Sequence, residues 1–408
     1  MNKVTRRRLL QGAAAIAPLA TLGWRRSANA QSKPIRLGHP SDFTGPSAAF
    51  ARGQSNGIQM AIDQVNAEGG LLGRKLELVD RDSQMKPNLG TEHARELVTS
   101  GNVDFLFGPA SSAVALAISN IAKQYKKIVM MSTPNTPRLL IELFHPYVFN
   151  VSPSGVMEAR ALADALAAKY QKFGFIGADF EAAHQGLKYF KDRVAIKNPK
   201  ATFTTEQWPK LGESDYSPYI TALLSSQPDA IYSYLFGADM IGFFKQSAAY
   251  GLPQKAPVGG LTFLVDLISL GQDMPDGMYG LMRAPFFAIS NDAMTKFGAD
   301  YKKRFDTYPD DNAILAHEGA HALFEAIRKA GTIDSDAVVK TLETISVPAL
   351  TGTLKFRALD HQCNSPLYVG VTTKSDKYPF KILRDVQVVK AEDIWSTPQE
   401  IEAARNKT

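Results

Sequence analysis

The sequence predicts an α/β fold with parallel sheets, divided between two domains. Short runs of β-branched and aromatic residues alternate with longer stretches of helical periodicity along the chain. This alternation is the βαβ rhythm of parallel sheets, because each parallel strand needs a long crossover connection to the next. The length of 408 residues, with 45% hydrophobic and 21% charged residues, is typical of a soluble globular chain with room for two domains.

The predicted strands, in chain order, are "IRLGHPSD", "KLELVDRD", "VDFLFGP", "KIVMMST", "FGFIGAD" and "AIYSYLFG". Between them lie predicted helices such as "RGQSNGIQMAIDQVNAEGG", which two glycines end, and "SAVALAISNIAKQYKK", whose basic last turn suits the helix dipole. Open α/β sheets bind ligands at the carboxyl ends of their strands, where polar, glycine and proline residues gather here. No GxGxxG or GxxxxGK[ST] motif follows any strand, so nothing indicates nucleotide binding.

The first 30 residues predict an export signal. A basic head precedes an Ala-rich apolar stretch at residues 12–23 and the small-x-small cleavage site ANA at residues 28–30. The run TRRRLL at residues 5–10 resembles a twin-arginine signal, although Gln11 stands where lysine is common. The apolar stretch is too short to span a bilayer. We therefore expect a soluble periplasmic protein that starts near Gln31.

Charge and cysteine content exclude several function classes. The net charge of +6 arises in the leader, and the remainder of the chain has as many acidic as basic residues, so no nucleic-acid partner is expected. The single cysteine, Cys363, excludes an intramolecular disulfide and has no Cys/His arrangement around it beyond the nearby His361. Without a Cys-x-x-Cys pair and with seven histidines, metal ligands are scarce, and we expect neither a metal nor a cofactor.

Two loops that follow neighbouring strands are suited to bind an anion. "GPASS" at residues 108–112 opens an Ala-rich helix, whose first amide groups and dipole favour negative charge, and one of its serines is expected to cap that helix. "MSTPNTP" at residues 131–137 lies beside it on the same sheet edge. These loops predict a donor-rich pocket for a carboxylate, with capping and turn chemistry alone as the alternative. The candidate ligand contacts in the two loops are Ala110, Ser111, Ser112, Thr133, Asn135 and Thr136.

Two enzyme interpretations are weaker. The first loop lacks the second glycine of a GxSxG nucleophile elbow. "HEGAH" at residues 317–321 matches the HExxH pattern, in which two histidines bind zinc and the glutamate activates water. No third ligand is evident, and His317 and His321 flank an apolar stripe, sharing a polar side with Glu318 and allowing a His321–Glu325 pair. The apolar stripe consists of Ala313, Ala316, Ala320, Leu323, Phe324 and Ile327. We expect this helix to form a packing surface, and we expect no catalytic residue in the protein.

Four further blocks carry a family resemblance: "SDFTGPSAAFARGQSNGIQMAIDQVNAEGG", "GLLGRKLELVDRDSQMKP", "VDFLFGPASSAVALAIS" and "IVMMSTPNTP". In this order and spacing they resemble the type I periplasmic solute-binding proteins of ABC importers, the Leu/Ile/Val-binding family. The resemblance covers nearly all of the chain after the leader. "YVFNVSPS" is similar to the entry into the family's second lobe, and "GMYGLMRAPF" to the return to the first.

The resemblance implies a type I periplasmic binding protein fold: two doubly wound three-layer lobes joined by three crossover segments, which close on a solute by a hinge motion. The crossovers are expected near Asn150–Ser154, Tyr279–Arg283 and Arg357–Pro366. They divide the chain into an N-terminal lobe, residues 31–150 plus 281–357, and a C-terminal lobe, residues 151–280 plus 358–408.

The family's ligand residues carry over unevenly. Its cleft aromatic after the Gly-Pro turn falls on Phe50, its serine on Ser112 with Ser111 alongside, and its second carboxylate-binding loop on Asn135 and Thr136. In the second lobe, Ala183 stands at the place of a common tyrosine, so Phe180 is expected to supply the ring. The next cleft aromatic falls on Phe236.

The family's ammonium-binding acid has no counterpart, because Leu261 or Thr262 stands at its place and no carboxylate precedes Asp266. A buried ammonium without a carboxylate costs several kcal/mol, so an α-amino acid should bind poorly unless Asp179 or Asp239 substitutes. We therefore expect a small carboxylate with an apolar or aromatic body, such as an aromatic acid or a branched keto acid.

The expected partners are this solute and the membrane permease of an ABC importer, and the protein is expected to be a monomer. Binding of a branched-chain amino acid remains an alternative within the same family. Alternatives of another class are a periplasmic ligand sensor domain, which would share the cleft, and an HExxH zinc hydrolase.

Overall fold

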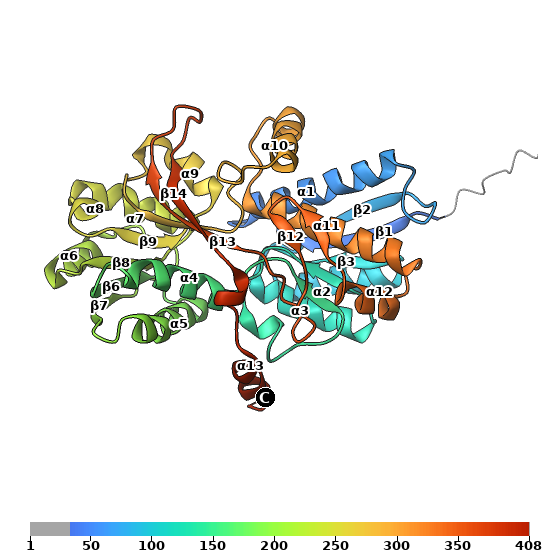
Figure 1. The fold of residues 1–408 in the computed structure, drawn as a ribbon, viewed down its shortest axis with the longest axis horizontal. Helices are drawn as coiled ribbons and strands as arrows, with labels where there is room; N and C mark the ends of the chain where they lie inside the picture. Colours follow the sequence, from blue (N-terminus) through green and yellow to red (C-terminus); the bar gives the residue numbers. More distant parts are fainter. Residues whose placement is uncertain (1–32, 408) are drawn as a thin grey trace, which may run out of the picture. The chain divides into compact units, whose positions relative to one another are not determined.

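The computed structural model describes residues 33–407. The expected leader at residues 1–30, with its twin-arginine pattern and cleavage site, lies outside the described residues. Among the residues that are described, none of the helices combines the length and the apolar character needed to cross a membrane. Two α/β lobes, each built around one large sheet, confirm the predicted fold class (Figure 1).

The first sheet is wholly parallel, with strand order β2-β1-β3-β4-β5. Its strands are β1 (Ile35–Ser41), β2 (Leu76–Asp82), β3 (Phe105–Phe107), β4 (Val129–Met131) and β5 (Val148–Asn150). Alternate side chains of β3 face opposite ways. Phe105 and Phe107 pack in one hydrophobic cluster, and Leu106 packs in another on the opposite face of the sheet. The sheet is covered on both faces, which explains why its strands are hydrophobic throughout.

The helices of the first lobe come from two separate parts of the chain. The first part gives α1 (Ala48–Ala67), α2 (Pro87–Thr99), α3 (Ser112–Gln124) and the short helix η1 (Pro137–Leu139). The second part gives α10 (Asp292–Phe305), α11 (Asp311–Ala330), α12 (Ser335–Leu342) and the small ribbon of β11 (Val347–Ala349) and β12 (Gly352–Leu354). Helices α1 and α11 touch backbone to backbone, because a Cβ on Gly57 would lie 2.0 Å from the carbonyl oxygen of Ala313.

The second sheet has the order β14-β13-β10-β9-β8-β6-β7. Five of its strands are parallel: β6 (Lys172–Gly177), β7 (Thr202–Gln207), β8 (Ala230–Tyr234), β9 (Val258–Leu261) and β10 (Tyr279–Met282). The long strands β13 (Leu367–Thr373) and β14 (Ile382–Val389) extend it as an antiparallel hairpin, which the βαβ rhythm of the sequence did not predict.

Helices cover both faces of the second sheet as well (Figure 1). One face packs against α4 (Gly155–Ala167) and α5 (Glu181–Lys197). The other packs against α6 (Ser217–Ser226), α7 (Gly237–Ala249), α8 (Leu252–Lys255) and α9 (Leu264–Leu270), which the short helix η2 (Gly271–Asp273) follows.

The chain passes between the two sheets near the three expected positions: after β5, after β10 and between β12 and β13. The first and third crossovers are hydrogen-bonded to each other, since the Asn150 amide donates to the His361 carbonyl at 3.2 Å and the Cys363 amide donates to the Asn150 carbonyl at 2.9 Å. Strand β10 runs to Met282, so we propose that the lobe boundary expected at residue 281 lies just after this strand.

The end of the C-terminal segment, which was expected to belong to the second lobe as part of residues 358–408, also contacts the first lobe. Helix α13 (Pro398–Arg405) lies beside the first lobe, where the Arg405 guanidinium donates to the carbonyl oxygens of Leu140 and Ile141 at 3.3 and 3.1 Å. No local pattern predicts this contact, because the partners of Arg405 are backbone carbonyls in a loop far away in the chain. We call residues 394–407 the C-terminal strap.

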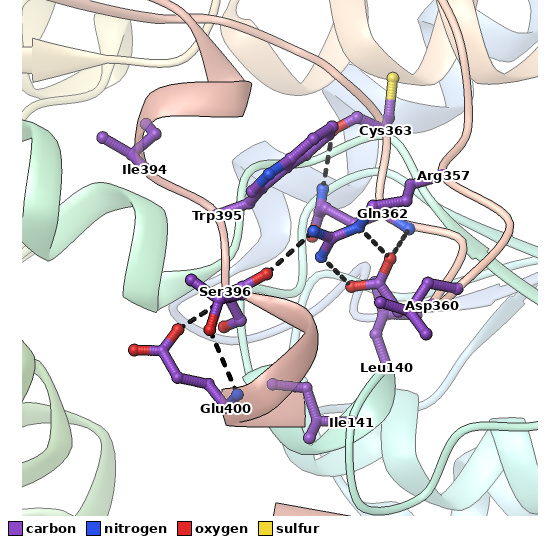
Figure 2. Close-up of polar contacts among 12 residues, drawn as sticks. Leu140, Ile141, Arg357, Asp360, Gln362, Cys363, Ile394, Trp395, Ser396 and Glu400 are labelled. Carbon is purple, nitrogen blue, oxygen red and sulfur yellow. Dashed lines mark hydrogen bonds and ion pairs between the residues drawn. The ribbon is translucent and has the colours of Figure 1, made fainter. Parts of the chain in front are cut away.

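The strap is also held by the third crossover (Figure 2). The Arg357 guanidinium forms two hydrogen bonds with the Asp360 carboxylate, donates to the Ser396 carbonyl at 2.8 Å and lies 4.2 Å from the centre of the Trp395 ring. On the second lobe, Arg160 of α4 donates to the Trp395 carbonyl at 2.7 Å. The strap therefore contacts both lobes and the crossover between them.

Candidate ligand-binding site

A cavity of about 450 Å³ lies at the carboxyl ends of strands from both sheets. The first lobe contributes the loops after β3 and β4 and the start of α1. The second lobe contributes the loops after β6, β8 and β9, and Arg283 of the second crossover. Open α/β sheets bind ligands at this edge. Nine of the ten predicted contacts line the cavity: Phe50, Ala110, Ser111, Ser112, Thr133, Asn135, Thr136, Phe180 and Phe236.

The first loop presents the start of α3 to the cavity. Ser111 is the N-cap residue, and its own amide donates to the buried Asp42 carboxylate at 2.6 Å. Contrary to expectation, the Ser111 side chain makes no capping hydrogen bond. The amide groups of the first helical turn lack intrahelical acceptors, and the helix dipole places partial positive charge beside them. Uncapped amides and two serine hydroxyls thus meet at one end of the cavity.

The second loop is tied to the second lobe. The Asn135 side-chain amide donates to the Glu158 carboxylate of α4 at 2.8 Å, and the Gly155 amide donates to the Asn135 carbonyl at 2.7 Å. Thr133 is buried, and its hydroxyl donates to the Asn312 side chain at 2.8 Å. Asn135 and Thr133 therefore shape the cavity wall through fixed hydrogen bonds.

Aromatic rings form much of the remaining wall. Phe50 of α1 lies 4.8 Å, centre to centre, from Phe263 at the end of β9, so the two lobes touch through these rings. Phe180 and Phe236 meet edge to face at 6.0 Å, and Phe180 lies 6.1 Å from Tyr234. Tyr189, Tyr234 and Phe263 also line the cavity and were not predicted. Tyr234 could have been found, because it lies two residues before Phe236, where a strand places side chains on one side.

The prediction for Thr262 is wrong. Leu261 and Phe263 line the cavity, whereas Thr262 does not. The Thr262 side chain is buried, and its hydroxyl donates to the Gly260 carbonyl at 3.3 Å. Successive side chains of extended backbone point to opposite sides, so the neighbours on both sides of Thr262 reach the cavity and Thr262 turns away from it.

A buried ion pair, missed in the sequence, lies at the cavity wall. Arg283 lines the cavity with its side chain 3% exposed, and Glu158 opposite is 5% exposed. The Arg283 Nε and Nη2 atoms both lie 2.7 Å from Glu158 Oε1, and Nη1 donates to the Thr133 carbonyl at 2.8 Å. The Phe263 ring covers the guanidinium, with its centre 5.5 Å away. In the sequence, the one feature that could have indicated Arg283 is its position directly after a hydrophobic strand.

The acids named as substitutes for an ammonium-binding carboxylate do not reach the cavity. Asp179 pairs with His184 at 2.7 Å and is largely exposed, and Asp239 is buried and accepts from the Gly212 amide at 3.1 Å. Among the described residues that line the cavity, Glu181 is the one acid, and the bases are Arg138 and Arg283. Glu181 was not predicted, although its place directly after Phe180 at the start of α5 could have indicated it.

The HEGAH helix lies away from this cavity. All six residues of the predicted apolar stripe are fully buried, which confirms the packing face. Glu318 does not share a polar side with the histidines: it is buried, and its carboxylate accepts from the Thr351 amide at 2.6 Å. Nε2 of His321 contacts Gln64 of α1 at 2.8 Å, and the Glu325 carboxylate, which the spacing allowed to pair with His321, pairs with Arg328. In the part of the chain that the structure describes, no cluster of three or more His, Cys, Asp or Glu residues could hold a metal ion.

Comparisons with known proteins agree with this geometry. The sequence pattern of the periplasmic binding protein family matches residues 34–377. "Leu/Ile/Val-binding protein homolog 4" of Brucella melitensis is 23% identical over 385 residues, covering 90% of this chain and 89% of that protein.

Two solved structures have the same fold. One is a solute-binding protein of an ABC transporter from R. palustris in complex with 4-hydroxybenzoate, with a TM-score of 0.80, 18% identity, and coverage of 90% of this chain and 100% of that chain. The other is a leucine-binding protein from Thermotoga maritima, with a TM-score of 0.76, 19% identity, and coverage of 88% and 99%. At these identities the likeness shows the fold.

The family match spans most of the chain, and both lobes line one cavity. The predicted resemblance to the Leu/Ile/Val-binding branch is confirmed. The chain therefore belongs to the periplasmic binding protein family.

Proposed function

We propose that the chain is an extracytoplasmic solute-binding protein that delivers a small carboxylate with an aromatic or apolar body to the permease of an ABC importer. One observation carries the solute class: the uncapped start of α3, with Ser111 and Ser112, shares a cavity with a wall of aromatic rings. Amide groups at a helix start bind carboxylates, and the rings supply apolar faces for the solute body.

The charges of the cavity support an acid over an amino acid. Glu158 is neutralised by Arg283 and also accepts from Asn135, so it is not available to an ammonium group. Glu181 is the remaining carboxylate among the described lining residues; it lies exposed at the rim and accepts from Gln185 at 3.1 Å. An ammonium buried deeper would lose its hydration without gaining a carboxylate partner, which costs several kcal/mol.

Known relatives include binders of both solute classes. The R. palustris protein holds 4-hydroxybenzoate and the T. maritima protein is a leucine-binding protein, with nearly the same structural similarity to this chain. Fold likeness therefore does not decide between an aromatic acid and a branched-chain amino acid. The alternative, an amino acid, would require Glu181 as the ammonium partner.

Hinge closure is the proposed mechanism. A solute that touches α3 of the first lobe and the phenylalanines of the second lobe stabilises the state in which the lobes lie together. A permease would then recognise that state. A sensor role shares the same cleft, and genes for a permease and an ATPase beside this gene would favour the importer role. We also propose export to the periplasm through the twin-arginine-type leader.

A thermal-shift screen of the mature protein tests the solute class, because a ligand that binds the native state raises its stability by mass action. We expect benzoate and 4-hydroxybenzoate to raise the melting temperature, and leucine and benzamide to leave it unchanged. At a concentration one hundred times the Kd, the gain is about 2.7 kcal/mol. Stabilisation by leucine with no response to the aromatic acids would contradict the proposal.

The variant Glu181→Gln separates the two classes independently. Removing this negative charge should leave the affinity for an aromatic acid unchanged or higher, because repulsion at the rim is lost. It should weaken the binding of an amino acid, whose ammonium would lose its remaining partner. Lys188→Gln, a largely exposed position of the same helix outside the cavity lining, is the matched control.

A further inference from the structure

Gln54 lies under the two solute-binding loops. It follows Phe50 by one turn of α1, so both side chains point to the same side of the helix. Phe50 reaches the cavity, whereas Gln54 is fully buried. A buried polar side chain persists when its hydrogen bonds are satisfied, and their partners show what the side chain holds in place.

The Gln54 amide group joins both loops. Its Nε2 atom lies 3.3 and 3.4 Å from the carbonyl oxygens of Gly108 and Pro109, which lead directly into the start of α3. The same nitrogen lies 3.1 Å from the Ser132 hydroxyl and 2.9 Å from the Thr133 hydroxyl, which lead into Asn135 and Thr136. The two N–H groups of the Gln54 side chain thus donate to four acceptors, two in the loop after β3 and two in the loop after β4.

The remaining contacts fix the direction of these hydrogen bonds. The Gln54 side-chain oxygen accepts from the Ser41 hydroxyl at the end of β1 at 2.9 Å. The Thr133 hydroxyl donates to Asn312, so it is available to Gln54 as an acceptor. The Gly108 and Pro109 carbonyls can only accept. A side chain of the same shape without donors at this point would leave buried acceptors unsatisfied.

We propose that Gln54 is a positioning residue for solute binding, which sets the α3 start and the 131–137 loop at the spacing that a carboxylate requires. This inference rests on the proposed solute class. Gln54 does not line the cavity, so it acts through the loops and not by touching the solute. Its loss should therefore lower the preference for a carboxylate over a neutral analogue of the same shape.

Hydrogen exchange tests the positioning without any ligand. In the variant Gln54→Met, peptides that cover residues 105–116 and 129–138 should exchange their amide hydrogens faster than in the wild-type protein. Gln59→Met is the matched control, because Gln59 lies on the same helix and bonds to Asp63 alone among the described residues. Unchanged exchange of both loops in Gln54→Met would overturn the proposal, whatever the solute proves to be.

Binding of benzoate and benzamide, measured by titration calorimetry, tests the consequence for selectivity. In Gln54→Met we expect the affinity for benzoate to fall about tenfold, which corresponds to the free energy of about one hydrogen bond. Any weak binding of benzamide should change little. An equal loss for both compounds would indicate a merely structural role. If the wild-type protein binds neither compound, the proposed solute class fails, and hydrogen exchange still decides the role of Gln54.

Gln54→Glu provides a second variant of nearly the same size. An ionised carboxylate here has no donor for the Gly108 and Pro109 carbonyls, and a protonated one regains a single donor. The loss of benzoate affinity should therefore be larger at about pH 8 than at about pH 5, relative to wild type at the same pH. A loss that does not depend on pH would count against the proposal.

Discussion

The buried pair of Arg283 and Glu158 gives the sharpest energetic prediction. Both side chains are nearly inaccessible, their closest atoms lie 2.7 Å apart, and each has a further partner in the loop that lines the cavity. Removing one partner of such a pair leaves an uncompensated buried charge, which costs about 3–5 kcal/mol. We therefore expect Arg283→Met and Glu158→Leu each to lower the free energy of unfolding by that amount.

The double variant should cost much less than the sum of the two. Replacing both partners with apolar side chains removes the stranded charge and leaves the Thr133 carbonyl and the Asn135 amide without their partners. We expect a loss of about 2–4 kcal/mol, where two additive losses would reach about 6–10 kcal/mol. The coupling energy between the two positions should thus be several kcal/mol.

Urea unfolding of the mature protein, followed by circular dichroism and tryptophan fluorescence, measures these losses where the two probes coincide. Arg304→Met is the matched control, because Arg304 pairs with Asp63 at the surface with its side chain 41% exposed, and its loss should stay within about 1 kcal/mol. Single losses that simply add in the double variant, or an Arg283 loss no larger than the Arg304 loss, would refute the reasoning.

Two further predictions concern pH and the C-terminal strap. Burial raises the pKa of Asp266 to about 7, so the stability that its protonated form contributes is present below about pH 4 and is lost as the pH rises through 7. The variant Asp266→Asn should flatten the fall in the free energy of unfolding across this range. A pH profile of stability that the substitution leaves unchanged would contradict the assignment. Deleting residues 396–408 removes the Arg405 contacts and the buried Ile401. We expect a loss of roughly 3 kcal/mol and a larger radius of gyration without ligand, and an unchanged small-angle scattering profile would show that the strap does not restrain the lobes.

Local signals predicted six strands of the two large sheets, and the residue-level prediction found nine of the residues that line the cavity. A strand and the hydroxyl-rich loop that follows it can be recognised from residues that are adjacent in the sequence. Parallel strands bring such loops together at the carboxyl edge of the sheet. Thr262 was misplaced because the resemblance left two adjacent positions open, and a shift of one residue in extended backbone reverses the side chain. Arg283 and the strap were missed because their partners, Glu158 and the carbonyls of Leu140 and Ile141, are distant in sequence.

The histidines of HEGAH show why spacing alone does not establish a metal site. His317 and His321 lie on one side of α11, as the pattern requires, with ring centres 4.4 Å apart and ring planes tilted by 59°. Both Nε2 atoms, however, contact the same side-chain oxygen of Gln64, at 3.2 and 2.8 Å. Both Nε2 atoms thus face the Gln64 side chain of α1 in this arrangement.

The glutamate of the pattern is turned away as well. Burial raises the pKa of Glu318 to about 7, and its carboxylate accepts from Thr351 in the turn between β11 and β12. These contacts direct the Glu318 carboxylate towards the β11–β12 turn. Gln64 is brought to the histidines by the close approach of α1 and α11 at Gly57, a contact between segments about 250 residues apart that no local pattern contains. The same helix α1 carries Phe50 at the cavity and Gln54 beneath its loops.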